Sequence, residues 1–129
     1  MIAALDHLVL TTRFLDKCVD FYTRVLEMQV QSFGNGRLAL LFGNQKINLH
    51  EYGHEFEPKS EKSVPGSLDL CFLVNRPLAQ VIEALNAHGI PIIEGPVVRT
   101  GACFQIMSVY IRDPDGNLVE LSARIGDKL

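Results

Sequence analysis

The sequence contains an internal repeat of one strand-helix-strand-strand-strand pattern, which restricts the folds open to the chain. His7 and Asp69 lie at equivalent places in two strand-like segments, 62 residues apart. The first expected helix ends near Glu27 and the second ends at Gly89, which is the same offset. Strands are indicated by β-branched runs with alternating faces, and helices by apolar residues at helical spacing. The sequence therefore predicts an α+β fold built from two copies of one module.

Each module is expected to contain one helix and four strands, with glycine and asparagine in the turns between strands. In the first module we expect strands at 4–12, 28–33, 37–42 and 46–51 and a helix over 14–27. In the second we expect strands at 67–74, 92–99, 103–112 and 118–122 and a helix from Pro77 to Gly89. The polar segment 52–66 is interpreted as a linker, so that module one covers about 1–51 and module two about 67–123 of a single domain, residues 1–129.

Composition excludes several classes of protein. With 129 residues, 47% of them hydrophobic, the chain is typical of one globular domain that needs no disulfide or metal to fold. A net charge of −3 offers no general attraction to nucleic acid. No apolar stretch approaches the roughly 20 residues of a membrane span, and no secretory signal is visible.

The three cysteines are odd in number and form no C-x-x-C pair. This usage is typical of reduced thiols and predicts a cytoplasmic protein. Cys71 and Cys103 fall within expected strands, where we interpret them as small buried apolar groups and not as nucleophiles.

Polar residues stand at equivalent positions in the first and last expected strands of both modules. These residues are His7, Asn48, Asp69 and Glu120, and His50 points the same way as Asn48. Polar groups in apolar strands are costly to bury unless they are paired or bind a ligand, so this pattern predicts a shared site. The structural alternative is a histidine whose nitrogens are satisfied by the backbone or by Asp69.

Three segments give the sequence a resemblance to a known family: DHLVLTT at the start, FYTRVLEM after the first helical turn, and YIRDPDGNLVELS near the end. Together they resemble the vicinal oxygen chelate superfamily, which includes glyoxalase I, bleomycin-resistance proteins and extradiol dioxygenases. The resemblance covers about residues 4–123, and KINLHEYGHEFEPK, PGSLDLCFLV and VVRTGA are most similar to the glyoxalase domain-containing protein 5 group. It implies curved mixed sheets and modules paired in a homodimer.

The resemblance also implies a metal site. It places metal ligands at His7 and Glu120, and His50 supplies a second imidazole in a set suited to Zn, Ni, Mn or Fe. Glu120 and Asp69 are the candidate catalytic carboxylates. Asp69 stands where many relatives have histidine, and Asn48 where glyoxalase I has an acidic ligand. The expected substrate-binding residues are Asn48, Arg99, Phe104 and Tyr110.

Three functions remain open on this basis. The first is a divalent-metal-dependent lyase or isomerase of the glyoxalase type, acting on a small substrate with adjacent oxygens. The second is an extradiol-type dioxygenase with non-haem iron. The third is a metal-free binding or resistance protein. Arg99 is placed in a turn between strands, where an exposed arginine with no ligand is the competing interpretation.

Overall fold

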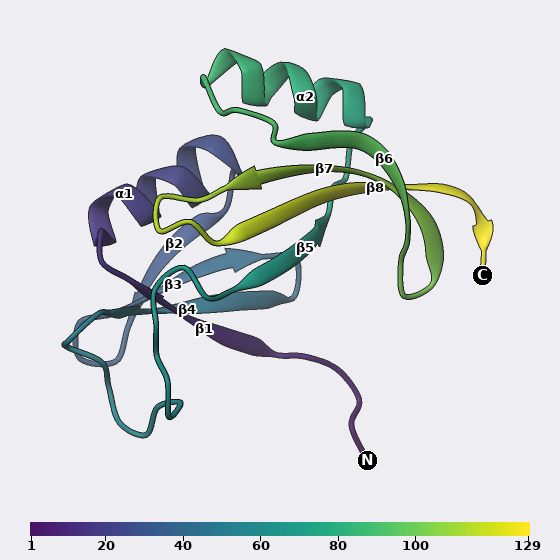
Figure 1. Ribbon diagram of the computed structural model, residues 1–129. Helices are drawn as coiled ribbons and strands as arrows, with labels where there is room; N and C mark the ends of the chain where they lie inside the picture. Colours follow the sequence, from purple (N-terminus) through teal and green to yellow (C-terminus); the bar gives the residue numbers. More distant parts are fainter. The chain divides into compact units, whose positions relative to one another are not determined.

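A computed structural model describes all residues from Met1 to Leu129, and the chain divides into two compact units. The first unit comprises residues 1–68 and 114–116, and the second comprises 69–113 and 117–129. Each unit contains one four-stranded sheet (Figure 1). Residues 52–66, interpreted from the sequence as a linker, lie within the first unit.

In the first unit, one outer strand runs parallel to its neighbour and the remaining pairs are antiparallel. Its elements are β1 (His7–Thr12), α1 (Leu15–Asp20), the π-helix η1 (Phe21–Val25), β2 (Gln29–Phe33), β3 (Arg37–Phe42) and β4 (Gln45–Glu51). The strand order is β1-β4-β3-β2. Residues 1–6 precede the sheet as an irregular, exposed segment (Figure 1).

The second unit repeats this plan. Its elements are β5 (Asp69–Leu73), α2 (Leu78–Ala87), β6 (Glu94–Thr100), β7 (Phe104–Arg112) and β8 (Leu118–Lys128), in the strand order β5-β8-β7-β6. β5 is parallel to β8, and the other pairs are antiparallel. Figure 1 shows α2 running along this sheet beside β6 and β7. The predicted α+β fold of two βαβββ modules is thereby confirmed.

Each sheet has one apolar and one polar face, because side chains alternate along a strand and paired residues share a face. In the first sheet, Leu10, Leu40 and Ile47 are fully buried on the apolar face. In the second, Val109 and Val119 are fully buried in the same way, and Leu85 of α2 is buried as well. The polar side chains that could bind a ligand therefore lie on the opposite face of each sheet.

Two element boundaries differ most from expectation. The first helix is α-helical only to Asp20 and continues as η1, where the N–H of Leu26 donates to the carbonyl of Phe21 at 3.2 Å, a spacing of five residues. Apolar spacing cannot distinguish these two helix types. The last strand runs to Lys128 and not to residue 122, because β7 supplies backbone partners as far as Phe104.

Three residues lie in environments that differ from the prediction. Cys71 and Cys103 are both exposed, not buried. Cys71 lies on the polar face of an outer strand, and Cys103 in the β6–β7 connection, so neither position faces the apolar core. Arg99 lies within strand β6 and not in a turn. None of the helices is long and apolar enough to cross a membrane.

Candidate functional site

The polar face of the second sheet gathers side chains from neighbouring strands around Glu120. The register pairs Glu120 of β8 with Cys71 of β5 on one side and with Tyr110 of β7 on the other. Ser108 and Ser122 form the next pair along the same face. Since paired residues point to one side of a sheet, these five side chains share one surface.

Two serine hydroxyl groups hold the Glu120 carboxylate in place. The Ser108 hydroxyl donates to Glu120 Oε2 at 2.6 Å, and the Ser122 hydroxyl lies 3.3 Å from the same oxygen. The two hydroxyl oxygens are 2.7 Å apart, and both serines are fully buried. Hydrogen bonds to an ionised acceptor are the stronger kind, so this pair fixes the orientation of one carboxylate oxygen.

A cavity of about 490 Å³ opens on this polar face. Glu120, Arg99 and Arg124 contribute its charged lining, and Phe104 and Ile106 contribute apolar surface. Another part of the wall is the turn from Thr100 to Cys103. A cavity with apolar walls and a few convergent polar groups is typical of a small-molecule site.

Gly101 allows that turn to close tightly. Its N–H donates to the carbonyl of Phe104 at 2.8 Å. A Cβ atom at Gly101 would lie 2.7 Å from that same carbonyl oxygen, which is closer than real Cβ atoms approach. The shape of this wall of the cavity therefore depends on glycine.

Tyr110 orients the side chain of Arg99. Arg99 Nε donates to the Tyr110 hydroxyl oxygen at 3.0 Å, and Arg99 Nη2 lies 3.4 Å from a carboxylate oxygen of Glu94. The pKa of Arg99 is raised, mainly by the hydrogen bond to Tyr110 and further by the charges of Glu94 and Glu120. The positive charge of Arg99 therefore interacts with the negative charge of Glu120.

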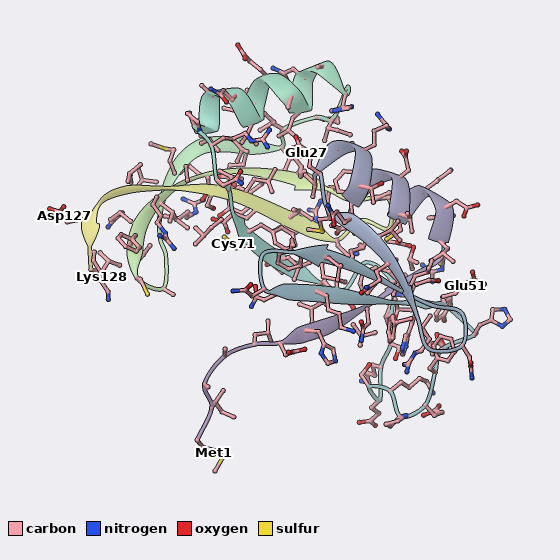
Figure 2. The ribbon with its side chains drawn as sticks, turned by 180° about the vertical axis from the view of Figure 1, so that it is seen from behind. Met1, Glu27, Glu51, Cys71, Asp127 and Lys128 are labelled. Atoms are coloured by element: carbon pink, nitrogen blue, oxygen red, sulfur yellow. The ribbon has the colours of Figure 1, made fainter.

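Cys71, labelled in Figure 2, lies on β5. It is one of the residues that line the cavity. Its thiol is 3.3 Å from the Ser122 hydroxyl. Partial burial raises the pKa of this thiol, and the negative charge of Glu120 raises it further. A raised pKa lowers the thiolate fraction, so Cys71 is poorly suited to act as a nucleophile.

The polar face of the first sheet carries two buried residues with unpartnered polar atoms. Both ring nitrogens of His50 and the Oδ1 atom of Asn48 are buried without a hydrogen-bond partner. The two residues lie two positions apart on β4, and therefore on one face. Buried polar atoms without partners are rare and call for a ligand or another explanation.

The environment of His50 favours the neutral imidazole. Its ring lies 5.6 Å from the ring of Phe56, and the guanidinium of Arg37 lies 4.5 Å from that same phenyl ring. Burial lowers the pKa of His50, and the positive charge of Arg37 lowers it further. A neutral imidazole is the form that binds metal ions.

The register separates His7 from His50. His7 pairs with Lys46, whereas His50 pairs with Thr11, four residues further along the strands. Four residues of parallel strand span about 13 Å. His7 is exposed, and its Nδ1 atom lies 2.8 Å from a carboxylate oxygen of Asp6. The structure therefore does not bring these two histidines together.

A family model described as the Glyoxalase/Bleomycin resistance protein/Dioxygenase superfamily matches residues 4–121. The chain belongs to this superfamily. Among its relatives is the glyoxalase domain-containing protein RDO1 of Mycosarcoma maydis, 56% identical over 122 residues that cover 95% of this chain and 69% of the relative. The resemblance identified from the sequence motifs is confirmed.

Solved structures show the same relationship. The crystal structure of virulence protein STM3117 from Salmonella typhimurium matches with a TM-score of 0.95 and 50% identity, covering 97% of this chain and 99% of that one. Lactoylglutathione lyase from Agrobacterium tumefaciens matches with a TM-score of 0.73 and 22% identity, covering 95% of each chain. At that identity the likeness shows a shared fold only.

Members of the superfamily often use divalent metals, which makes the positions of the donor side chains informative. Within either unit, no group of three or more His, Cys, Asp or Glu side chains is arranged to hold a metal ion. His50, with two unpartnered nitrogens, nevertheless fits the role of a ligand, and Asn48 Oδ1 fits that of a neighbouring oxygen donor.

Only some of the site residues predicted in the second unit lie together. Within the second unit, the structure brings together Glu120, Arg99, Phe104 and Tyr110. Asp69 is exposed at the start of β5, two residues before Cys71, and does not line the cavity.

Sequence reasoning missed three residues of the site in the second unit. These are Ser108, Ser122 and Arg124. The signal was present, because Ser122 and Arg124 follow Glu120 at steps of two along β8. Residues at such steps share one face of a strand.

Proposed function

We propose that this chain is a glyoxalase-type lyase or isomerase that acts on a small substrate with adjacent oxygens. In this proposal the substrate binds in the cavity of the second unit, and Glu120 removes or returns a proton next to a carbonyl group. The observation that carries the proposal is the position of Glu120, which lines the cavity and accepts the Ser108 hydroxyl at 2.6 Å.

The serine contacts support a role in proton transfer. A general base works best when its reacting oxygen is held in a fixed direction within hydrogen-bond reach of the proton. Ser108 and Ser122 both contact Oε2, and in this proposal Oε1 is the oxygen that faces the substrate. The Arg99 guanidinium, which lines the same cavity, favours any negative charge that develops on the substrate.

The proposal includes a divalent metal, with His50 as a ligand and Asn48 as a neighbouring oxygen donor. Their unpartnered atoms and the lowered pKa of His50 support these roles. A divalent ion held by these residues would supply Lewis acidity, the chemistry that stabilises developing negative charge. Glu120 remains a predicted ligand to be tested separately, whereas His7 lies too far along the strands from His50 to share one ion with it.

Metal content separates these roles. Reconstituted wild-type protein is expected to retain a divalent metal, measured by inductively coupled plasma mass spectrometry after free metal is removed, and His50→Ala is expected to lose it. His54→Ala is the matched control, because His54 is exposed in the segment after β4. Loss of metal in Glu120→Gln would add Glu120 as a ligand, and retention would leave it acting on the substrate. Equal metal in the His50 and His54 variants would contradict the metal assignment.

Proton exchange tests the reaction directly. Metal-loaded protein in D₂O is expected to exchange the proton next to the carbonyl in at least one of a panel of small 2-oxo and 2-hydroxy acids, followed by proton NMR. Glu120→Gln should abolish the exchange, and Glu83→Gln, an exposed change on α2, should not. Exchange that persists in Glu120→Gln would contradict the role of Glu120.

A metal-free binding protein is the second candidate. It is favoured by the hydrogen bonds of the Glu120 carboxylate, which is already satisfied in part without a metal. Ligand binding unaffected by a chelator, with no exchange of any candidate substrate, would support it. The extradiol dioxygenase is less well supported, because its two-histidine set would need His7 and His50 close together.

We also propose that the protein is a cytoplasmic homodimer. The outer strands β1 and β5 are each hydrogen-bonded on one side only, and their side chains Val9 and Leu73 are 41% and 53% exposed. Exposed strand edges with apolar side chains favour association. Light scattering after gel filtration should give twice the 14.4 kDa of the chain, and a mass of 14.4 kDa would contradict the dimer.

A further inference from the structure

Two arginine side chains enter the cavity of the second unit from different strands. Arg99 comes from β6 and Arg124 from β8, and both line the cavity together with Glu120. No other ionised group lines it, so two positive charges face one carboxylate. The chain as a whole has a net charge of −3, which makes this local excess of positive charge distinctive.

Arg124 has no carboxylate partner. Its guanidinium lies over the ring of Phe104, 4.6 Å from the centroid, a contact that restrains the side chain but leaves its N–H donors available. Arg99 is held differently, because Tyr110 accepts its Nε at 3.0 Å. The neighbouring Glu94 is exposed, and its contact with Arg99 Nη2 is long, at 3.4 Å.

We infer that Arg99 and Arg124 together bind an oxyanion group of the substrate, a carboxylate or a phosphate, at the end of the cavity formed by the β6–β7 turn. Planar guanidinium groups match the geometry of such anions with paired hydrogen bonds. Phe104 and Ile106 provide apolar surface beside them for a short carbon chain. The inference rests on the proposed function and specifies its substrate class, a small organic anion.

The arrangement also explains why both signs of charge occur in one cavity. An anion bound by the arginines is fixed at one end, so the carbon next to it can be presented to Glu120 without the two carboxylates meeting. Positioning of this kind can supply a large part of an enzyme's rate acceleration. A substrate of this site would then carry a free carboxylate or phosphate group, which an uncharged carbonyl compound lacks.

Binding of simple anions tests this inference without any turnover. Isothermal titration at low salt is expected to show malonate or inorganic phosphate binding to the wild type, and no binding of malonamide, which has no charge. Arg124→Gln and Arg99→Gln should each weaken the binding about tenfold or more. Arg24→Gln is the matched control, since Arg24 is an exposed arginine in η1 of the first unit.

Two further variants keep the test decisive. Arg124→Lys retains the charge but not the planar group, so it should restore part of the affinity and should fold if Arg124→Gln does not. Glu120→Gln should still bind malonate even though it loses proton exchange. Preference for malonate would assign a carboxylate, and preference for phosphate a phosphate ester; either supports the inference.

Failure of the inference can be distinguished from failure of the proposed function. Equal anion affinity in the wild type and in both glutamine variants, or no anion binding at all, would overturn the anion site even if Glu120-dependent exchange is observed. Anion binding that depends on the arginines, without any exchange, would leave the anion site in place and overturn the lyase or isomerase proposal.

Discussion

In the second unit the polar side chains of the sheet form hydrogen bonds with one another. In the first unit two buried polar residues have side-chain atoms without a hydrogen-bond partner. Ser108 and Ser122 hold Glu120, and Tyr110 holds Arg99. On the corresponding face of the first sheet, the nitrogens of His50 are buried without hydrogen bonds. The two units have the same strand order, so the difference comes from the side chains and not from the topology.

One fold can thus hold two kinds of site. A carboxylate held by hydroxyl groups is already oriented before any ligand arrives, and this is suited to proton transfer. Unpartnered buried atoms carry an energetic cost that a ligand can remove, and this is suited to binding. Substitutions in the two units are therefore expected to have different effects.

The largest effect is expected from Gly95→Ala in the second unit. Gly95 has a φ of +103°, and a Cβ atom there would overlap the carbonyl oxygen of Ser108. Backbone cannot move aside as a flexible side chain can, so the loss should be about 3 kcal/mol or more of unfolding free energy. Urea unfolding followed by circular dichroism measures this loss.

Gly43→Ala is the control in the first unit. Gly43 also has a positive φ, +50°, but nothing lies within 4 Å of the added Cβ atom. The expected loss is therefore only about 1 kcal/mol, from the backbone conformation alone. Equal losses of unfolding free energy in the two variants would show that the close approach to Ser108 does not affect stability.

Ser108→Ala and His50→Leu should change stability in opposite directions. Removing the Ser108 hydroxyl takes away a hydrogen bond to a carboxylate and should cost about 1 to 2 kcal/mol. Replacing His50 with an apolar residue removes two buried nitrogens without partners and should stabilise metal-free protein by about 1 kcal/mol. Destabilisation by His50→Leu in metal-free protein would mean that the imidazole is already satisfied.

Acidification should weaken the first unit through the same histidine. Burial lowers the pKa of His50 in the folded chain, so below the ordinary value of 6.5 the unfolded chain takes up a proton that the folded chain does not. The contribution of neutral His50 to the free energy of unfolding is therefore complete above pH 6.5. It is lost as the pH falls toward the lowered pKa of the folded chain. Urea midpoints from pH 8 to pH 5 measure it, and His50→Leu should remove the part of the slope due to this residue.

The sequence predicted the fold well because its signals are local. Alternating apolar residues and glycine turns define each strand, and the repeat of the pattern defines the two modules. The end of the α-helix at Asp20 and the extension of β8 to Lys128 were missed, because the first depends on which backbone bonds form and the second on a partner strand.

The site was harder to predict, because side-chain partners lie far apart in the sequence. Glu120 was identified from its place in the repeat, but its contact with Ser108 depends on the register of β7 against β8. The expectation that Cys71 is buried was wrong, since one-dimensional spacing does not reveal that this strand lies at the edge of its sheet.

Thiol alkylation provides the smallest and most local test of the contrast. Cys18 in α1 of the first unit is fully buried and should remain unmodified in the folded protein. Cys71 is exposed, but burial of part of its thiol and the charge of Glu120 raise its pKa, so it should react with iodoacetamide more slowly than free N-acetylcysteine at pH 7.5. Peptide mass spectrometry over a time course measures both rates.

Glu120→Gln should speed the reaction of Cys71, because it removes a neighbouring negative charge that disfavours the thiolate, and it should leave Cys18 unmodified. An unchanged rate at Cys71 would show that the Glu120 carboxylate does not influence the thiol side of the cavity.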